Sequence, residues 1–132
     1  MELSPSDESE KYSLTKFESM LKTNNVFFFD SNEFENIINH YLEIGKIKLA
    51  KKAVKMGLNQ HPTSTNLKLY QVEILIFENK LSKADTILTE RYTLEPNNEE
   101  IYIQKANIFS KSDKHYKAID TLKIAIDLSE SD

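Results

Sequence analysis

The feature of this chain that most constrains its fold is a repeat of 34 residues. Small residues recur at this step at Ala50, Ala84 and Ala118. The same step relates other positions, namely Val54, Leu88 and Leu122, then Tyr41, Leu75 and Phe109, and the two prolines Pro62 and Pro96. A period of this length, filled by pairs of helical segments, is the pattern of a helix-turn-helix solenoid. The sequence therefore predicts an all-α chain in which each repeat packs against the next.

The composition suits one small globular domain. Of the 132 residues, 39% are hydrophobic and 29% are charged, which is ordinary for a chain that buries a core. The formal net charge of −4 provides no general attraction for nucleic acid or an anionic membrane. The absence of cysteine excludes disulfides, thiolate metal sites and cysteine nucleophiles. The polar, acidic first residues do not resemble a signal peptide and no apolar run has the length of a membrane span, so we expect a soluble, cytoplasmic protein.

Residues 1–30 are expected to form a leader in front of the repeats. Residues 1–12 are polar and acidic, which predicts a loose terminus. Behind a capping Ser13, the helical spacing of Leu14 and Phe17 predicts a short amphipathic helix that ends near residues 23–25. The apolar run 26–29 is expected to lie extended across the first repeat. We interpret it as a cap over the end of the solenoid, although an aromatic platform for a ligand is the alternative.

The three repeats are predicted over residues 31–64, 65–98 and 99–132. The first opens at a capping box formed by Asp30 and Glu33. Its first helix is expected to end at Gly45 in a left-handed conformation. Its second helix is expected over residues 48–60, ending before Pro62 because the residue before a proline avoids the helical region.

The helices of the second and third repeats follow the same logic. We expect the second pair over residues 66–79 and 82–94, with Ser82 as the N-cap of the latter. The third pair is expected over residues 99–112 and 114–128, with Asn97 as the N-cap of its first helix.

These repeats resemble the tetratricopeptide family. The likeness covers residues 31–132 and rests on the small residues Ala50, Ala84 and Ala118, the aromatics Tyr41 and Phe109, and the closing prolines Pro62 and Pro96. It implies a right-handed α-α superhelix of three helix-turn-helix repeats with an N-terminal capping helix. Ile38 and Val72 depart from the family's small residue in the first helix. The leader and first repeat, including residues 17–21 and 28–30, also resemble the amino-terminal part of repeat proteins common in Bacteroidetes.

The resemblance implies a protein-interaction module with a concave groove lined by the first helix of each repeat. The residues assigned to this partner-binding groove are Asn32, Glu35, Asn36, Asn39, Asn66, Leu69, Tyr70, Glu73, Phe77, Ile103, Gln104, Asn107 and Lys111. Asparagine amides can pair with a peptide backbone, and aromatic side chains can anchor a partner. For Leu69, Tyr70 and Phe77, packing against neighbouring helices is an equally good interpretation. Glu35, Glu100 and Gln104 stand where chaperone-binding repeats carry basic residues, which argues against a peptide carboxyl terminus as ligand.

The last predicted helix supports an alternative function. Its apolar residues Ile119, Leu122 and Ile126 have no predicted cover, because no further repeat follows them in the sequence. This face could mediate self-assembly as a structural segment of a longer repeat protein, or a weak homodimer.

Patterns for catalysis, metal binding and nucleic-acid binding are not found. His40, His61 and His115 lie in different repeats, and none has a second histidine at the helical spacing of a metal site. The two glycines exclude a glycine-rich phosphate loop. The lysine-rich stretch 46–55 is interpreted as the solvated face of a helix rather than a nucleic-acid or membrane surface. We therefore expect no enzyme, cofactor or metal, and a protein or peptide as partner.

Overall fold

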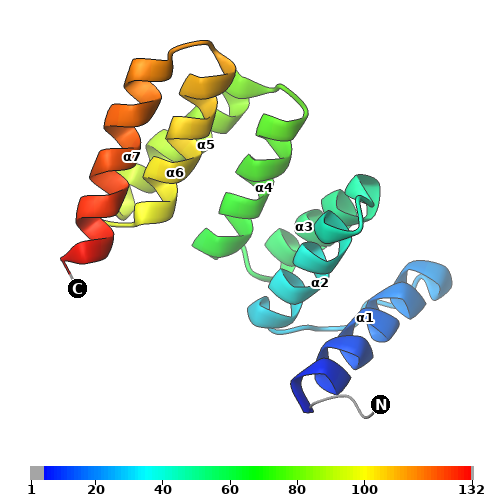
Figure 1. Cartoon of the computed structure of the whole chain (residues 1–132). Helices are drawn as coiled ribbons and strands as arrows, with labels where there is room; N and C mark the ends of the chain where they lie inside the picture. Colours follow the sequence, from blue (N-terminus) through cyan, green and yellow to red (C-terminus); the bar gives the residue numbers. More distant parts are fainter. Residues whose placement is uncertain (1–4, 132) are drawn as a thin grey trace. The chain divides into compact units, whose positions relative to one another are not determined.

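The computed structural model describes residues 5–131, and within them the chain is all-α. Figure 1 shows the helices in chain order, which are α1 (Pro5–Thr23), α2 (Ser31–Glu43), α3 (Ile47–Gln60), α4 (Thr65–Phe77), α5 (Leu81–Leu94), α6 (Glu99–Lys111) and α7 (His115–Glu130). The chain forms two compact units, Met1–Leu67 and Lys68–Asp132. The boundary between them falls inside α4.

The first unit packs α1 against α2 and α2 against α3. Its core is aromatic, because Phe17 of α1, Phe29 of the connecting segment, and Phe34 and Tyr41 of α2 are all at most 1% exposed. The ring centroid of Phe29 lies 6.3 Å from that of Phe17 and 5.2 Å from that of Phe34. Phe29 therefore joins α1 to α2, whereas Val26 and Phe28 of the same segment are 85% and 64% exposed.

The connecting segment between α1 and α2 is held by side chains from α3 and the turn that follows it. Gln60 donates through Nε2 to the carbonyl oxygen of Phe27 at 2.8 Å and accepts from the backbone N–H of Phe29 at 3.0 Å. The ring of His61 lies 2.6 Å, through Nε2, from the carbonyl oxygen of Phe29. These contacts satisfy backbone groups that neither a helix nor a strand would satisfy.

The prediction for the start of the chain is wrong over residues 5–12. These residues are helical, so α1 begins at Pro5 rather than at Ser13, while residues 1–4 lie outside the described part. A proline suits the first turn of a helix, and Asp7 and Glu8 in that turn complement the helix dipole. Ser13 is not a cap: it is 3% exposed in the middle of α1, and its hydroxyl donates to Glu33 Oε2 at 2.6 Å.

The predicted signals at the ends of α2 are confirmed. Asp30 and Glu33 form a capping box, in which the backbone N–H of Asp30 donates to Glu33 Oε1 at 3.0 Å. Gly45 has a φ of +75° and follows α2, in a conformation that a side chain would strain. The helix α3 ends at Gln60, before Pro62, as expected.

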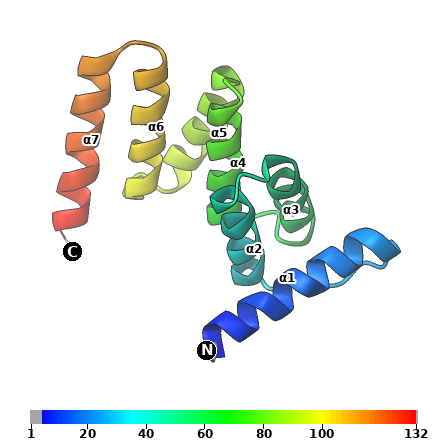
Figure 2. The same ribbon diagram turned by 45° about the vertical axis from the view of Figure 1, so that its right-hand side comes forward.

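The second unit has an apolar core between α4, α5 and α6. Its members are Leu69, Val72 and Ile76 of α4, Ala84 and Leu88 of α5, and Ile101 of α6. Helices α6 and α7 lie side by side and antiparallel in Figures 1 and 2. Buried alanines, Ala106 on α6 and Ala118 and Ala125 on α7, line this pair, and their small side chains let the two helices approach closely.

The turns inside the three helix pairs share one geometry at the 34-residue step. Gly45, Asn79 and Asp113 all have a positive φ, of 75°, 60° and 61°. In each turn the next residue, a lysine, donates its backbone N–H to a carbonyl oxygen five residues earlier at 2.8 Å, in the pairs Lys46–Tyr41, Lys80–Leu75 and Lys114–Phe109. This is the C-terminal motif that uses a left-handed residue to satisfy the last carbonyls of a helix.

Two predicted N-caps are displaced by one position or more. Helix α5 begins at Leu81 with Lys80 at the cap, so Ser82 lies inside its first turn. Asn98 rather than Asn97 caps α6, and its Oδ1 accepts from the backbone N–H of Glu100 at 3.1 Å. At α5 the cause is the left-handed turn at Asn79, which restarts the helix without a side-chain cap.

Candidate functional site

The groove residues predicted on the first unit lie on α2 and at the start of α4. Asn32, Asn36, Asn39 and Asn66 are exposed, and Glu35 is half-buried. The amide of Asn66 donates to Glu35 Oε1 at 3.1 Å, and the amide of Asn39 donates to Glu43 Oε1 at 3.1 Å. The structure thus brings Asn66 of α4 and Glu35 of α2 together. The side-chain amides of Asn66 and Asn39 each already donate one hydrogen bond within the protein.

Helix α1 borders this α2 surface. A cavity of about 320 Å³ is lined by both helices, through Asp7, Glu10, Lys11 and Leu14 of α1 and Asn36, Ile37 and His40 of α2. The sequence did not predict that α1 lies beside this surface of α2, because residues 5–12 were interpreted as a loose terminus. The acidic first turn behind Pro5 was the signal that could have found it.

On the second unit, the structure separates the three α4 residues whose role the sequence left open. Leu69 is 5% exposed and belongs to the core, so for this residue the packing interpretation is correct. Tyr70 is half-buried, whereas Phe77 is 65% exposed. Because these two lie seven residues apart, they share a face of α4 with Glu73.

The residues predicted on α6 are also divided between surface and interior. Ile103 is half-buried, Asn107 is exposed, and Gln104 is 5% exposed. Lys111 donates through Nζ to the carbonyl oxygen of Ile76 at 2.9 Å, which ties the end of α6 to the end of α4. Lys111 is exposed, and its ammonium group satisfies a carbonyl oxygen at the C-terminal end of α4.

An acidic cluster links α4 and α6 within this unit. It consists of Glu73, Glu100 and the amide of Gln104, whose Nε2 donates to Glu100 Oε1 at 3.3 Å. Desolvation raises the pKa of Glu73, and the charge of Glu100 raises it further. Desolvation also raises the pKa of Glu100; the hydrogen bond from Gln104 opposes this increase, and the charge of Glu99 adds to it. We call Glu73, Glu100 and Gln104 the α4–α6 acidic cluster.

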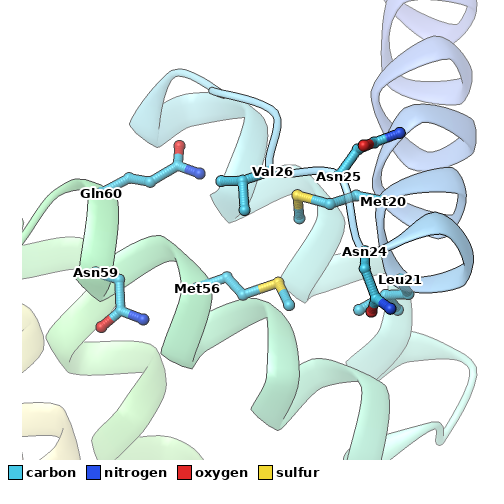
Figure 3. A pocket seen from close by; sticks show the side chains of 8 residues that line it. All are labelled: Met20, Leu21, Asn24, Asn25, Val26, Met56, Asn59 and Gln60. Carbon is cyan, nitrogen blue, oxygen red and sulfur yellow. The ribbon is translucent and has the colours of Figure 1, made fainter.

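A further cavity on the first unit was not predicted from the sequence. It has a volume of about 350 Å³ and lies between the end of α1, the segment after it, and the end of α3. Figure 3 shows its lining, which is Met20, Leu21, Asn24, Asn25, Val26, Met56, Asn59 and Gln60. The sulfur of Met20 accepts from the backbone N–H of Phe27 at 3.2 Å, and Val26 is 85% exposed beside it. No periodic sequence signal marks this cavity, because its lining comes from three separate segments.

The predicted assembly face on α7 is open. Ile119 is 50% exposed, Leu122 is 41% exposed and Ile126 is 55% exposed. They fall at helical spacing on one face of α7. Tyr116, which is 87% exposed, extends this apolar surface toward the start of the helix.

The histidine and acidic side chains do not gather into a metal-binding group in the described part of the chain. Among residues 5–131, no group of three or more His, Asp or Glu side chains is arranged to hold a metal ion. The lysines of α3, including Lys48, Lys52 and Lys55, are exposed. Of the helices that the structure describes, none combines the length and the apolar character needed to cross a membrane.

No protein-family model matches this chain, and no curated protein sequence matches it significantly. Over residues 5–131 the chain is an all-α protein whose helices pack sequentially in antiparallel pairs.

Proposed function

We propose that this chain is a tetratricopeptide-like solenoid that binds a peptide or protein partner and performs no chemistry of its own. The observation that carries this proposal is the solvent-facing aromatic on α4: Phe77 is 65% exposed, and half-buried Tyr70 and accessible Glu73 share its face. An exposed aromatic beside polar groups is the usual composition of a protein-binding surface.

The repeat part of the proposal is supported by positions that recur every 34 residues. Ala50 and Ala84 are fully buried and Ala118 is 7% exposed, as expected where the helices of a pair cross. The left-handed turns at Gly45, Asn79 and Asp113 follow the same step. A shared packing position together with a shared turn is expected when one supersecondary unit is repeated.

The binding part of the proposal is supported by the chemistry of the α4–α6 face of the second unit. Phe77 and Tyr70 offer apolar area, while Asn107 offers an amide with both donor and acceptor groups. Aromatic anchors with nearby hydrogen-bonding side chains suit a helical or extended peptide.

The test is capture of a partner by the full chain and by single variants. The wild-type chain serves as bait in an extract of its source cells, and captured proteins are identified and then titrated as purified ligands. Phe77→Ala should weaken binding by about tenfold or more if Phe77 is a central anchor. Tyr70→Ala should also weaken binding, while circular dichroism shows that the helices are retained.

Leu94→Ala is the matched control, because Leu94 is 63% exposed on α5. It removes a similar exposed apolar side chain elsewhere and should leave capture unchanged. Equal binding by wild type and both aromatic variants would remove the α4–α6 face from the proposal. Loss of helical signal in Tyr70→Ala would instead assign that tyrosine to the core.

A second candidate function is self-assembly through α7. It is favoured by the exposed stripe of Ile119, Leu122 and Ile126. Lys114 stands at the start of α7 and Asp127 and Glu130 near its end, so two antiparallel copies would place unlike charges opposite one another. Isologous pairing of this kind forms a closed dimer.

Sedimentation over a concentration series tests the second candidate. The wild-type chain should increase in mass with concentration, and the double variant Ile119→Lys with Ile126→Lys should not. Leu94→Lys is the control for adding a lysine at another exposed apolar site. A wild-type chain that stays monomeric throughout the series contradicts self-assembly by this helix.

A further inference from the structure

One edge of the connecting segment between α1 and α2 is hydrogen-bonded to the rest of the first unit. Phe27 donates its backbone N–H to the sulfur of Met20 at 3.2 Å, and its carbonyl oxygen accepts from Gln60 Nε2 at 2.8 Å. Phe29 donates its backbone N–H to Gln60 Oε1 at 3.0 Å, and its carbonyl oxygen lies 2.6 Å from Nε2 of His61. The amide of Gln60 thus bonds a carbonyl oxygen and the N–H two residues further on, as a residue of a neighbouring β-strand does.

The opposite edge of the segment carries backbone groups that the protein leaves unpaired. In an extended chain, alternate residues direct their N–H and C=O groups to opposite edges, so those of Val26 and Phe28 face away from Gln60. Among residues 5–131, no group is hydrogen-bonded to the N–H of Phe28 or to the backbone of Val26, while the carbonyl oxygen of Phe28 accepts from Lys16 Nζ at 3.1 Å. Val26 is 85% exposed and Phe28 is 64% exposed. An open edge of β-branched and aromatic residues is a template for pairing with another strand.

The cavity of about 350 Å³ described above lies along this segment. Figure 3 shows Val26 on the segment, Met20 on α1 and Met56 on α3 around the same space. The lining combines apolar side chains with the carboxamides of asparagine and glutamine and contains no charged side chain. Methionine adapts to irregular shapes, and a carboxamide both donates and accepts hydrogen bonds. The cavity therefore suits an apolar side chain with peptide groups beside it.

We propose that the connecting segment receives an extended peptide of a partner protein as an added β-strand, and that the cavity takes an apolar side chain of this peptide. One peptide residue donates to the carbonyl oxygen of Val26 and accepts from the N–H of Phe28, which repeats on the open edge the pairing made by Gln60. In such complexes the main-chain hydrogen bonds supply affinity and a side-chain pocket supplies specificity. This site belongs to the first unit and does not use the α4–α6 face of the second.

The unpaired edge favours a strand over other occupants. A helical ligand has its backbone groups hydrogen-bonded along its own axis and offers none to Val26 or Phe28. A small molecule in the cavity would leave the edge unpaired. A second copy of this chain, paired edge to edge, would bring two Lys16 ammonium groups to one edge, and lysine at an edge disfavours such pairing. An extended peptide from a different protein meets none of these difficulties.

The test titrates a capped peptide of alternating threonine and valine, with one central leucine, into the full chain. Amide hydrogen exchange is followed by nuclear magnetic resonance. At saturation, exchange of the Phe28 N–H should slow by about tenfold or more, because that group gains a hydrogen bond. The N–H groups of Phe27 and Phe29 are already bonded and should change less.

Two altered peptides separate strand pairing from apolar contact. The same peptide with an N-methylated backbone keeps its side chains but has no backbone donors, and should bind about tenfold more weakly. Replacing the central leucine by aspartate should weaken binding by about tenfold or more, because the cavity lining offers no cation to a buried carboxylate.

The variants Phe28→Pro and Phe28→Ala locate the edge in the protein. Both lose the aromatic ring, whose centroid lies 5.4 Å from that of His61, but only proline loses the N–H. Phe28→Pro should therefore bind the peptide about tenfold more weakly than Phe28→Ala. This N–H has no partner within the described residues, so the proline variant should keep its helices, which circular dichroism checks. If it does not, the N-methylated peptide tests the pairing without altering the chain.

Several results would overturn the inference. They are equal binding of the plain and N-methylated peptides, unchanged exchange at Phe28 with peptide bound, equal affinity of the folded proline and alanine variants, or no binding up to the solubility of the peptide. Self-association of the wild-type chain that is lost in Phe28→Pro, without peptide binding, would assign the edge to a second copy instead. Phe77→Ala in the second unit should leave peptide binding unchanged, which separates this outcome from that of the proposed function.

Discussion

The two units of this protein place their carboxylates in contrasting surroundings. In the first unit, Glu33 accepts the hydroxyl of Ser13 at 2.6 Å and the backbone N–H of Asp30 at 3.0 Å. Burial alone would raise the pKa of Glu33, but these hydrogen bonds and the charge of Lys16 together lower it. In the second unit, burial and neighbouring carboxylates raise the pKa of both Glu73 and Glu100.

This contrast separates a carboxylate whose charged form is stabilised by its neighbours from two whose charged form is destabilised by burial and nearby carboxylates. Glu33 joins α1 to α2 and also caps the start of α2, so its charge is satisfied inside the fold. Glu100 accepts one hydrogen bond, from Gln104, but its charge raises the pKa of Glu73, and neither carboxylate has an ion-pair partner within the described residues. The following predictions test whether the first unit depends on its internal contacts and whether the second tolerates the loss of its acidic groups.

The largest expected effect is in the aromatic core of the first unit. Phe34 is fully buried and its ring lies 5.2 Å from that of Phe29, so Phe34→Ala should leave a cavity between α2 and the connecting segment. The expected loss in the free energy of unfolding is about 3–5 kcal/mol. Urea denaturation measures it. A loss below about 1 kcal/mol would show that this core can collapse around the missing ring.

Overpacking tests the helix crossing in the second unit. Ala84 is fully buried in the core of that unit, so Ala84→Phe has no room for its ring. We expect a cost of about 1–3 kcal/mol or more, measured as a lower melting temperature. Asp85→Phe, at the exposed neighbouring position, is the control for adding a phenylalanine to α5. An unchanged melting temperature for Ala84→Phe would contradict the repeat register.

A smaller effect is expected where Glu33 is held. Ser13→Ala removes the hydroxyl that donates to Glu33 and should destabilise the first unit by about 1 kcal/mol. It should also move the pKa of Glu33 upward, because a hydrogen bond that favours the charged form is lost. Carbon-detected titration of the carboxyl gives the pKa. An unchanged pKa would mean that Asp30 and Lys16 alone stabilise the charge.

The smallest effect is a difference in pH dependence between the units. Glu33 has a pKa below its ordinary value of 4.5, so its stabilising contribution is present above that pH and is lost as pH falls through the lowered pKa. Glu73 and Glu100 have raised pKa values, so acidification from neutral pH toward 4.5 should stabilise the second unit. Hydrogen exchange at α3 and α5 amides can follow each unit separately. Glu73→Gln with Glu100→Gln should remove the gain in the second unit.

The sequence correctly predicted the structural features that depend on neighbouring residues and missed those that depend on residues far apart in the chain. The capping box at Asp30 and Glu33, the turn at Gly45 and the end of α3 before Pro62 each follow from a few neighbouring residues, and all three were predicted. The position of Ser13 inside α1 was not predicted, because its hydrogen-bond partner Glu33 lies 20 residues further along the chain. The displaced start of α5 came from the left-handed turn at Asn79, for which an asparagine is a weaker signal than a glycine.

For the candidate site, the sequence predicted the faces of α4 and α6 but not which side chains remain accessible. Seven-residue spacing placed Tyr70 and Phe77 on one face, and only the packing of α5 and α6 decided that Leu69 is core while Phe77 is open. The cavity beside Met20 and Met56 combines three segments, so no local pattern could reveal it.

The sequence by itself determined the helix pairs of this protein, because helix periodicity, turn residues and the 34-residue step are properties of neighbouring positions. Only the tertiary structure decided how the charges are used. The hydroxyl of Ser13 reaches Glu33, whereas Glu73 and Glu100 come near each other with Gln104 and without a cation. The physical reason is that desolvation and Coulomb interactions depend on distances through space between residues far apart in the chain, which no local sequence pattern encodes.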